Sequence, residues 1–275
     1  MTATIAALLA EARQRIPVAE ARLLLGHLLG KSAAWLEAHR DDDVEVDADY
    51  ASLVGRRVAG EPIAYLLGVR EFYGRDFSVT PDVLIPRPET ELLVDIAKTR
   101  VSPGETARIL DLGVGSGCLA ITLALELPQA RVTAVDVLPA ALDVSRTNAL
   151  RLGARVEFVE SDWFAALAPR QFNLIVANPP YVAAGDPHLR EGDLRFEPAG
   201  ALTDHADGLS ALRCIIAQAR SWLVPGGWLF LEHGYDQAAA VRKLLDAAGF
   251  VDLDQHRDLA GIVRTSGGCR PGADD

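Results

Sequence analysis

The sequence RILDLGVGSGC at residues 108–118 decides the fold, because it joins an apolar strand, a glycine-rich turn and the start of an apolar helix. The turn consists of Gly113, Val114, Gly115, Ser116 and Gly117. Its three glycines allow a sharp turn and let a ligand approach without meeting Cβ atoms. Dinucleotide-binding turns have the spacing G-x-G-x-x-G and hold a pyrophosphate at a helix end, whereas this turn reads G-x-G-x-G. The spacing favours a ligand without phosphates, and a turn that serves only packing is the alternative.

Predicted strands and helices alternate from Ala107 onward, which is typical of a parallel sheet with helices on both faces. Apolar runs predict strands at 108–112, 131–137, 155–160, 172–177 and 227–232, and a weaker, hairpin-like pair at 251–256 and 261–265. Helical patterns cover 118–126, 140–152, 209–223 and 235–248. The predicted fold class is therefore α/β.

Polar and aromatic residues follow the second and third predicted strands. Asp136 ends the second strand, where a carboxylate can accept both hydroxyls of a ribose. Asp162 and Trp163 follow the third strand, where an adenine finds an acceptor and an aromatic wall. Each has a structural alternative, since Asp136 could cap the next helix and Trp163 could belong to the core. Together with the glycine turn they predict a nucleoside site at the carboxyl ends of the strands.

The tetrapeptide Asn178-Pro179-Pro180-Tyr181 directly follows the fourth predicted strand. Asn178 offers a side-chain carbonyl, while Pro179 and Pro180 remove two backbone donors and fix φ. A stiff turn of this kind, with carbonyl oxygens projecting from it, can hold a planar NH2 group. Tyr181 would then lie against the amide or base that carries this group. The alternative is an ordinary loop in which the prolines end a strand and the asparagine caps a turn.

The first part of the chain has a different pattern. Helical spacing of apolar residues from Thr2 to about Arg57 predicts a small bundle that is helical throughout. An acidic run lies between two of its helices and is either a solvated loop or a docking surface for a basic partner; it contains Asp41, Asp42, Asp43, Glu45, Asp47 and Asp49. Aromatic residues and glycines between Pro62 and Pro88 predict a hairpin that joins two domains, with residues 79–85 extended. Thr90 is expected to cap a helix from Leu92 to Ala97.

Composition excludes several classes of protein. The chain has 275 residues, 49% of them hydrophobic, which suffices for one large domain and a smaller one. Its formal net charge of −11 argues against broad binding to phosphate backbones. Cys118, Cys214 and Cys269 lack metal-ligand spacing, so neither a zinc site nor a disulfide framework is expected, and a reducing cytoplasm fits best. No apolar stretch approaches the roughly 20 residues that a membrane helix needs.

Taken together, the motifs resemble those of the S-adenosylmethionine-dependent methyltransferases, and among these the HemK/PrmC family, which methylates the glutamine side chain of peptide chain release factors. The resemblance covers nearly the whole chain. It rests on the helical first region, the glycine turn, the tetrapeptide at 178–181, FYG at 72–74, IPRPETE at 85–91 and RFEP at 195–198. Adenine-N6 methyltransferases share the tetrapeptide, whereas PRPETE and RFEP are specific to the family.

The resemblance implies a seven-stranded, Rossmann-like methyltransferase sheet in which the first and fourth strands are neighbours. It also implies three segments: a helical bundle domain at 1–61 that docks the release factor, a β-hairpin linker at 62–88, and a methyltransferase domain at 89–275. The partner would be a class I release factor, modified at the glutamine of its Gly-Gly-Gln loop. Direct binding of nucleic acid or of a membrane is not expected.

The family's site residues fall on matching positions of this sequence. S-adenosylmethionine, which leaves as S-adenosylhomocysteine, would be bound by Gly113, Val114, Gly115, Ser116, Gly117, Asp136, Trp163 and Asn178. The substrate glutamine would be bound by Asn178, Pro179, Pro180 and Tyr181, of which Asn178, Pro179 and Tyr181 are the catalytic candidates. No metal is implied, and no general base is evident. Arg87, Glu89 and Glu197 are expected to form structural ion pairs.

Two other functions remain open from the sequence. An adenine-N6 methyltransferase acting on DNA or RNA would use the same acceptors, with a flipped base stacked on Tyr181. The acidic first domain argues against this function, because a nucleic-acid reader of this size normally has a basic stripe. A module that binds the release factor or the ribosome without catalysis is the second alternative, and the intact glycine turn and Asp136 argue against it.

Overall fold

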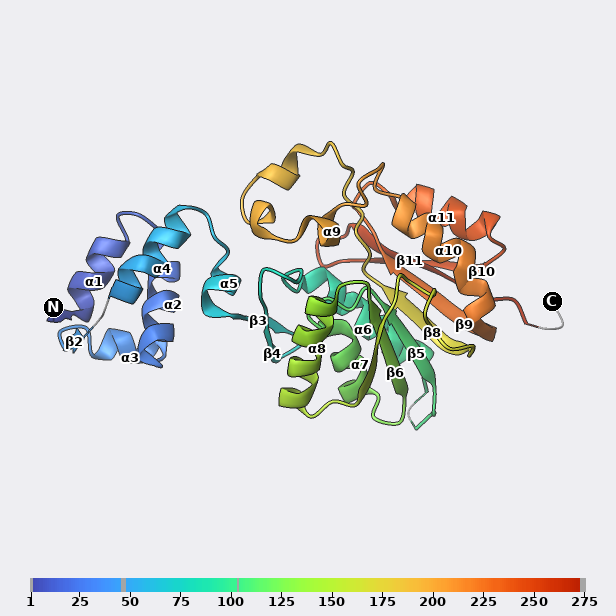
Figure 1. Ribbon diagram of the computed structural model, residues 1–275, viewed down its shortest axis with the longest axis horizontal. Helices are drawn as coiled ribbons and strands as arrows, with labels where there is room; N and C mark the ends of the chain where they lie inside the picture. Colours follow the sequence, from blue (N-terminus) through green and yellow to red (C-terminus); the bar gives the residue numbers. More distant parts are fainter. Residues whose placement is uncertain (1, 46–47, 103, 273–275) are drawn as a thin grey trace. The chain divides into compact units, whose positions relative to one another are not determined.

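The structure is a computed structural model that describes residues 2–45, 48–102 and 104–272. It divides into two compact units (Figure 1). The smaller unit comprises Met1–Val69 together with Glu191–Phe196, and the larger unit comprises Arg70–Arg190 and Glu197–Asp275. No helix within the described ranges is long and apolar enough to cross a membrane.

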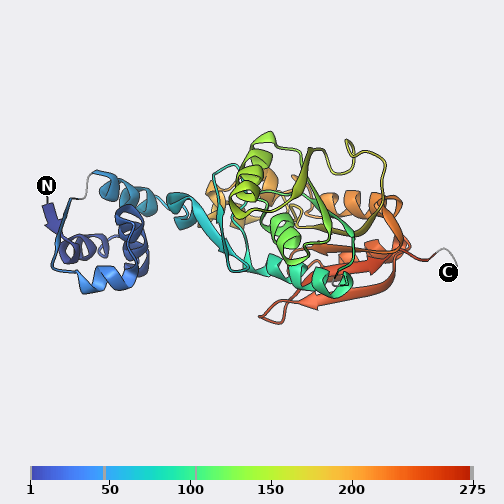
Figure 2. The same cartoon turned by 90° about the horizontal axis from the view of Figure 1, so that it is seen from below.

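The larger unit is built on a seven-stranded sheet with the order β10-β11-β9-β8-β5-β6-β7. The strands are β5 (Arg108–Leu112), β6 (Arg131–Asp136), β7 (Val156–Glu160), β8 (Phe172–Ala177), β9 (Leu223–Glu232), β10 (Val251–Arg257) and β11 (Val263–Cys269). All neighbouring pairs are parallel except those of β11, which runs antiparallel to both β9 and β10. Figure 2 shows β10 and β11, in orange to red, side by side. The first and fourth strands of this sheet, β5 and β8, are neighbours, as predicted.

Helices cover both faces of this sheet, so that two separate cores form (Figure 1). One face packs against α6 (Glu91–Arg100), α7 (Cys118–Glu126) and α8 (Pro139–Leu152). The other packs against α10 (Ser210–Trp222) and α11 (Ala238–Ala247). The chain crosses from β7, at one edge, to β8 on the other side of β5. Ligands of open α/β sheets bind at such a reversal of strand order, beside the carboxyl ends of the strands.

The predicted hairpin is present but shorter than expected. It consists of β3 (Val69–Phe72) and β4 (Arg75–Ser78), with a turn at Tyr73 and Gly74, both at positive φ. Residues 63–67 form helix α5 (Ile63–Leu67) instead of hairpin, and residues 79–85 form no strand. The β-branched pattern there reflects burial, since Val79, Val83 and Ile85 are all buried.

The smaller unit is mostly helical, with α1 (Ile5–Ala12), α2 (Val18–Leu29), α3 (Ala33–Ala38), α4 (Ala48–Val58) and α5 around one core. The expectation of a bundle helical throughout was wrong in two places, because β1 (Thr2–Thr4) pairs antiparallel with β2 (Asp43–Glu45). Part of the acidic run is therefore a strand, while Asp47 lies outside the described residues.

Polar contacts close the smaller unit. The Tyr50 hydroxyl donates to the Ala21 carbonyl at 3.2 Å, and Arg57 forms a two-pronged ion pair with Glu20 at 2.7 and 3.0 Å. Arg57 also contacts Asp193 at 3.3 Å. Asp193 belongs to the distant segment 191–196, and this contact helps to attach that segment to the smaller unit. The remaining short helices are η1 (Pro88–Thr90), η2 (Pro187–Arg190), η3 (Leu194–Phe196) and α9 (Ala199–Leu202).

Candidate active site

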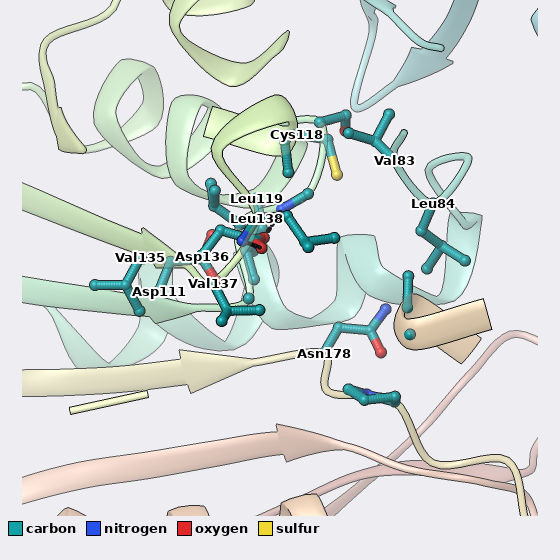
Figure 3. A pocket seen from close by; sticks show the side chains of 18 of the residues that line it. Val83, Leu84, Asp111, Cys118, Leu119, Val135, Asp136, Val137, Leu138 and Asn178 are labelled. Atoms are coloured by element: carbon teal, nitrogen blue, oxygen red, sulfur yellow. Dashed lines mark hydrogen bonds between the residues drawn. The ribbon is translucent and has the colours of Figure 1, made fainter. Parts of the chain in front are cut away.

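A pocket of the larger unit lies at the carboxyl ends of β5, β6 and β8 (Figure 3). Asp111 and the glycine turn line it from β5, Asp136 from β6, and Asn178 and Pro180 from the loop after β8. Residues from Asp82 to Thr90 form another wall, so the segment after the hairpin also contributes to the pocket. The sequence therefore predicted correctly that the glycine turn, Asp136 and the tetrapeptide lie together at the carboxyl ends of the strands.

The glycine turn adopts a conformation that requires its glycines. Gly113, Gly115 and Gly117 have φ values of 81°, 52° and 84°, a region that side chains other than glycine rarely adopt. The amides of Gly113 and Val114 both donate to the Val135 carbonyl at 2.9 Å, which ties the turn to β6. A Cβ atom at Gly117 would lie 2.7 Å from Ile121 Cδ1 and 3.0 Å from Ser145 Cβ, so this glycine permits close packing of α7 and α8.

Asn148 on α8 holds the glycine turn in place, a role that the sequence did not reveal. Its side-chain NH2 donates to the Ser116 carbonyl at 2.9 Å and to the Ser78 carbonyl at 2.9 Å. Its side-chain oxygen accepts from the Ser78 amide at 2.8 Å. A fully buried amide therefore connects the glycine turn to the end of β4 and uses all of its donors in doing so.

Of the two roles weighed from the sequence, the structure has Asp136 in the one at the start of the next helix, and the ribose contact stays a prediction. Its Oδ2 accepts from the Gly115 amide at 3.0 Å, and its Oδ1 accepts from the Leu138 amide at 3.0 Å, at the start of α8. Burial raises the pKa of Asp136, while these amides act in the opposite direction. Each carboxylate oxygen keeps lone pairs for a ligand, since one oxygen can accept more than one hydrogen bond.

Trp163 lies against the glycine turn. Its φ is 48°, and Ser161 Oγ donates to the Trp163 carbonyl at 2.9 Å, which holds this unusual backbone. The ring carbon Cζ3 lies 3.8 Å from the position a Cβ atom of Gly113 would take. Trp163 and Asp162 line the pocket, and the indole also packs on the core beneath α10. The indole of Trp163 therefore both lines the pocket and belongs to the edge of the core, which combines the two alternatives considered from the sequence.

Asp111 is a site residue that the sequence reading overlooked. It lies within β5, is 1% exposed, and lines the pocket. Burial raises its pKa to about 8, against the effect of the Ala120 amide, which donates to it. Its Oδ2 has no hydrogen-bond partner among the described residues. A buried carboxylate oxygen of this kind suits a ligand that carries a positive charge. The sequence did contain a signal for this residue, because an acid within an otherwise apolar strand is unusual.

The side chain of Asn178 is fixed by a contact that the sequence did not predict. Its Nδ2 donates to Thr90 Oγ1 at 3.0 Å, and the Thr90 hydroxyl donates to Glu232 Oε2 at 2.7 Å. Thr90 is the N-cap residue of α6, as expected, but its side chain makes no capping hydrogen bond, because its hydroxyl is held by Glu232. With Nδ2 directed at Thr90, Oδ1 of Asn178 remains as an acceptor for the pocket.

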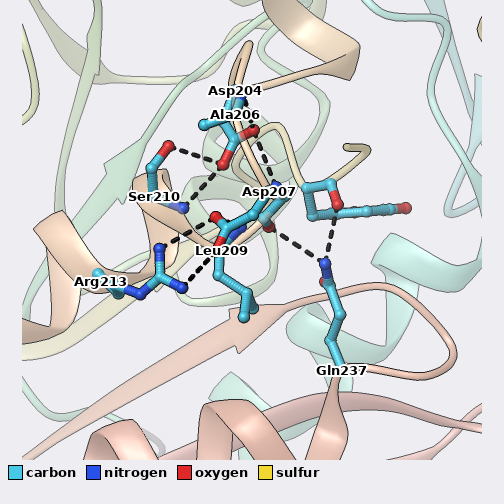
Figure 4. Close-up of polar contacts among 9 residues, drawn as sticks. Asp204, Ala206, Asp207, Leu209, Ser210, Arg213 and Gln237 are labelled. Atoms are coloured by element: carbon cyan, nitrogen blue, oxygen red, sulfur yellow. Dashed lines mark hydrogen bonds and ion pairs between the residues drawn. The ribbon is translucent and has the colours of Figure 1, made fainter. Parts of the chain in front are cut away.

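Tyr181 is held at both ends. Its hydroxyl donates to Glu232 Oε1 at 3.3 Å, and its carbonyl accepts from Gln237 Nε2 at 2.9 Å. Gln237 also donates to the Gly208 carbonyl at 3.1 Å and accepts from the Gly234 amide at 2.8 Å. The loop that contains Gly208 is itself fixed by Asp204, which accepts from the Ala206, Gly208 and Ser210 amides and the Ser210 hydroxyl (Figure 4).

The motif PRPETE contributes Pro86, Arg87 and Thr90 to the lining of the pocket, and Glu197 of the motif RFEP holds this segment in place. Arg87 pairs with Glu197 at 2.5 Å, and Glu197 also accepts from the Ile85 amide at 3.0 Å. The ion pair expected of Arg87 and Glu197 is therefore confirmed, while Glu89 has no ion pair with any residue that the structure describes. Arg195 belongs to the smaller unit, where it donates to the Ala59 carbonyl.

The pocket does not include every predicted site residue. It is lined by eight of them: Gly113, Val114, Gly115, Ser116, Asp136, Trp163, Asn178 and Pro180. Gly117, Pro179 and Tyr181 are not among the lining residues, and Gly117 and Tyr181 make the contacts given above. Within the described ranges, no group of three or more His, Cys, Asp or Glu side chains is placed to hold a metal ion.

Comparison with known proteins identifies the class. Residues 88–193 match the family named Methyltransferase small domain, and residues 2–68 match the PrmC N-terminal domain. The fold is also that of a methyltransferase from Pyrococcus furiosus, with a TM-score of 0.56 and 16% identity over 82% of this chain and 99% of that chain. The fold and pocket are therefore those of a methyltransferase of the α/β class.

Curated relatives narrow this class to a family. The release factor glutamine methyltransferase of Burkholderia pseudomallei is 55% identical over 92% of both chains. That of Bordetella pertussis is 55% identical over 92% of this chain and 95% of its own, and that of Escherichia coli is 43% identical over 91% of each. The chain belongs to the family of release factor glutamine methyltransferases.

Proposed function

We propose that this protein transfers the methyl group of S-adenosylmethionine to the side-chain amide nitrogen, N5, of the glutamine in the Gly-Gly-Gln loop of a class I release factor. One observation supports this most directly: the carboxamide of Asn178 is fixed through Thr90, with its oxygen left as an acceptor at the pocket. That arrangement suits a substrate NH2 group and, in a chain of this family, the amide of glutamine.

The residues of the pocket fit the cofactor. Asp111 Oδ2 is a buried carboxylate oxygen without a partner in the described chain, which suits the ammonium group of the methionine part. Asp136 has lone pairs for the ribose hydroxyls, and Trp163 offers a wall for the adenine. When bound, S-adenosylmethionine supplies an electrophilic methyl group on its sulfonium sulfur. S-adenosylhomocysteine is the product that leaves.

The tetrapeptide at 178–181 orients the nucleophile. An amide nitrogen is a weak nucleophile because its lone pair is delocalised into the carbonyl, so its approach must be well aligned. Oδ1 of Asn178 and the carbonyl of Pro179 each accept one N–H of the glutamine, and Tyr181 and Pro180 close the site around the planar amide. As the nitrogen gains positive charge, both acceptors bind it more strongly, which stabilises the transition state selectively. The methyl–sulfur bond breaks as the nitrogen–methyl bond forms, and the cationic amide, which is strongly acidic, then loses its proton to water.

The remaining parts of the chain serve the protein substrate. We assign a helical domain at 1–61 that docks the release factor, a linker at 62–88 whose hairpin is β3 and β4, and a methyltransferase domain at 89–275. We place the protein in the cytoplasm, where release factors work, and expect no direct binding of nucleic acid or membrane. The net charge of −11 supports a protein substrate over a phosphate backbone.

Incubation with labelled S-adenosylmethionine tests the function. A class I release factor should become labelled, and the mass of the tryptic peptide with the Gly-Gly-Gln loop should rise by one methylene group. A release factor with asparagine in place of that glutamine is the control and should stay unlabelled. Labelling of double-stranded or single-stranded DNA instead would establish the adenine-N6 alternative, and absence of labelling in both would leave a binding module.

A further inference from the structure

A chain of hydrogen bonds leads from the pocket to a buried acid. Asn178 Nδ2 donates to Thr90 Oγ1 at 3.0 Å, Thr90 donates to Glu232 Oε2 at 2.7 Å, and the Tyr181 hydroxyl donates to Glu232 Oε1 at 3.3 Å. Thr90 is 3% exposed and Glu232 is 1% exposed, so water does not compete for these groups. The four residues come from three places in the sequence: η1, the loop after β8, and the end of β9.

The direction of this chain follows from its end. A carboxylate has no proton and can only accept, so the single hydroxyl proton of Thr90 is committed to Glu232. The oxygen of Thr90 can then accept but no longer donate toward Asn178. Asn178 must therefore present its NH2 to Thr90, which directs its oxygen to the pocket. An ionised Glu232 thus selects one of the two orientations of a carboxamide that lies two hydrogen bonds away.

We propose that Thr90 and Glu232 are positioning residues that set the orientation of the Asn178 carboxamide, and that the ionised state of Glu232 is the state competent for methyl transfer. When Glu232 takes up a proton, it can donate to Thr90. The hydroxyl of Thr90 then turns to Asn178 and favours the carboxamide with its oxygen toward Thr90. The NH2 of Asn178 then faces the pocket, where it opposes the N–H groups of the substrate amide.

The surroundings of Glu232 make this change accessible near neutrality. Burial raises its pKa to about 7, and Glu89 acts in the same direction, while the donors Thr90 and Tyr181 and the charge of Arg264 lower it. Arg87 faces Tyr181, whose own pKa is raised by burial, so the phenol stays protonated. Burial raises the pKa of the nearby Cys118 thiol to about 12, so it stays neutral. Burial lowers the pKa of His233, the next residue in the chain, and raises the pKa of Asp111, in the pocket lining, to about 8. The Glu232→Gln variant is therefore needed to assign a titration near neutrality to Glu232.

The inference rests on the proposed function for its kinetic consequences. At saturating S-adenosylmethionine and release factor, kcat should fall below about pH 7 and approach a tenfold decrease per pH unit, as expected for one proton. Thr90→Val, which keeps the shape but lacks the hydroxyl, should lower kcat about tenfold or more and leave the Kd for S-adenosylmethionine within about twofold. Thr90→Ser should retain both the rate and the pH profile.

Glu232→Gln should abolish the acid limb of the kcat profile, whatever plateau it reaches, because glutamine does not titrate. An acid limb unchanged in Glu232→Gln, or a wild-type kcat in Thr90→Val, would overturn the proposal. Melting temperatures of all variants identify any that fail to fold, and Thr90→Ser keeps the test available if Thr90→Val is unstable.

A measurement without turnover separates this inference from the function. The side-chain 15N and 1H resonances of Asn178 in the free protein should shift between pH 6 and 8 in the wild type and in Thr90→Ser, and stay constant in Glu232→Gln. An Asn178 signal that does not titrate would refute the relay even if the enzyme methylates glutamine. If the Asn178 signal titrates but the protein does not methylate release factors, the proposed function is refuted and the relay is not.

Discussion

Two buried carboxylates, Asp111 in the lining of the pocket and Glu232 outside that lining, differ in their hydrogen-bond partners. Asp111 and Glu232 are both 1% exposed, and burial raises their pKa values to about 8 and about 7. Both oxygens of Glu232 accept hydrogen bonds from side chains of the protein, whereas Asp111 Oδ2 has no partner within the described chain. Glu232 therefore holds groups of the protein itself, whereas we propose that Asp111 receives a positively charged ligand.

This difference separates the site into two parts with different physical roles. We propose that the part around Asp111 and Asp136 is a binding surface whose free acceptors bind the cofactor. The part around Glu232, Thr90 and Asn178 is already complete, and its hydrogen bonds determine which atom meets the substrate. Substitutions in the first part should change affinity, and those in the second should change the rate of the chemical step.

Asn178→Ala should produce the largest effect. Loss of the acceptor that orients the amide should lower kcat by about 10³-fold, in the range for a group that acts on charge developing in the transition state. The Kd for S-adenosylmethionine should change little, since Asp111 and Asp136 remain. Asn173→Ala, near the start of β8 and outside the pocket, is the matched control. Full turnover in Asn178→Ala would refute the mechanism.

Asp111→Asn should act on affinity instead. Loss of a charged partner for an ammonium group should weaken binding of S-adenosylmethionine by about 10- to 100-fold, while kcat at saturation stays within a few-fold. Isothermal calorimetry and initial rates measure the two quantities separately. Unchanged affinity would show that the ligand's positive charge lies elsewhere in the pocket.

Asp111→Asn should weaken cofactor binding but stabilise the free protein. The pKa of Asp111 is about 8 in the folded chain and near 4 when unfolded. Between these values the folded chain keeps a proton that the unfolded chain releases, so stability falls as the pH rises from about 4 to 8. Asp111→Asn lacks this loss and should gain stability over the wild type from pH 5 to pH 8, as measured by urea unfolding. An equal difference at both pH values would contradict the assigned pKa.

The comparison also explains what the sequence could reveal. The glycine turn, Asp136 and Trp163 each follow a strand end directly, so the local pattern and the rules of parallel sheets predict their positions. Asn178 and the prolines are found in the same way. Asp111 was within reach of this reasoning, as an acid in an otherwise apolar strand.

Glu232 and Thr90 could not be found from local patterns. They are 142 residues apart in sequence, and their contact depends on how the start of α6 packs against the end of β9. A threonine before a helix is a common capping residue, so the local rule correctly predicted the N-cap position of Thr90, but not that its hydroxyl bonds Glu232 instead of a backbone amide. The strands β1 and β2 were missed for a related reason: three-residue strands 39 or more positions apart leave no periodic pattern.

Substitutions of Gly117 and Gly115 should have smaller effects than those of Asn178 and Asp111, and should show which glycine serves packing and which serves binding. Gly117→Ala should destabilise the fold by about 2 kcal/mol, because its Cβ would press on Ile121 and Ser145 at a positive φ. Gly115→Ala meets no atom within 4 Å and should cost about 1 kcal/mol of strain. Gly115 lines the pocket, however, so its substitution should weaken S-adenosylmethionine binding by more than that of Gly117. Thermal melts and calorimetry of both variants decide this, and the reverse order would show that the turn contacts the cofactor differently.

Gln237→Leu should have the smallest effect, because Gln237 acts on the site only through the backbone of Tyr181. Its removal leaves the carbonyls of Tyr181 and Gly208 and the Gly234 amide without their partner, although Glu232 still holds the tyrosine hydroxyl. We expect kcat to fall by about tenfold or less, with an unchanged Kd for S-adenosylmethionine. Gln218→Leu, on the exposed side of α10, is the matched control and should have no effect. A loss as large as that of Asn178→Ala would mean that the position of Tyr181 depends on Gln237 more than on Glu232, and that the completed half of the site extends to α11.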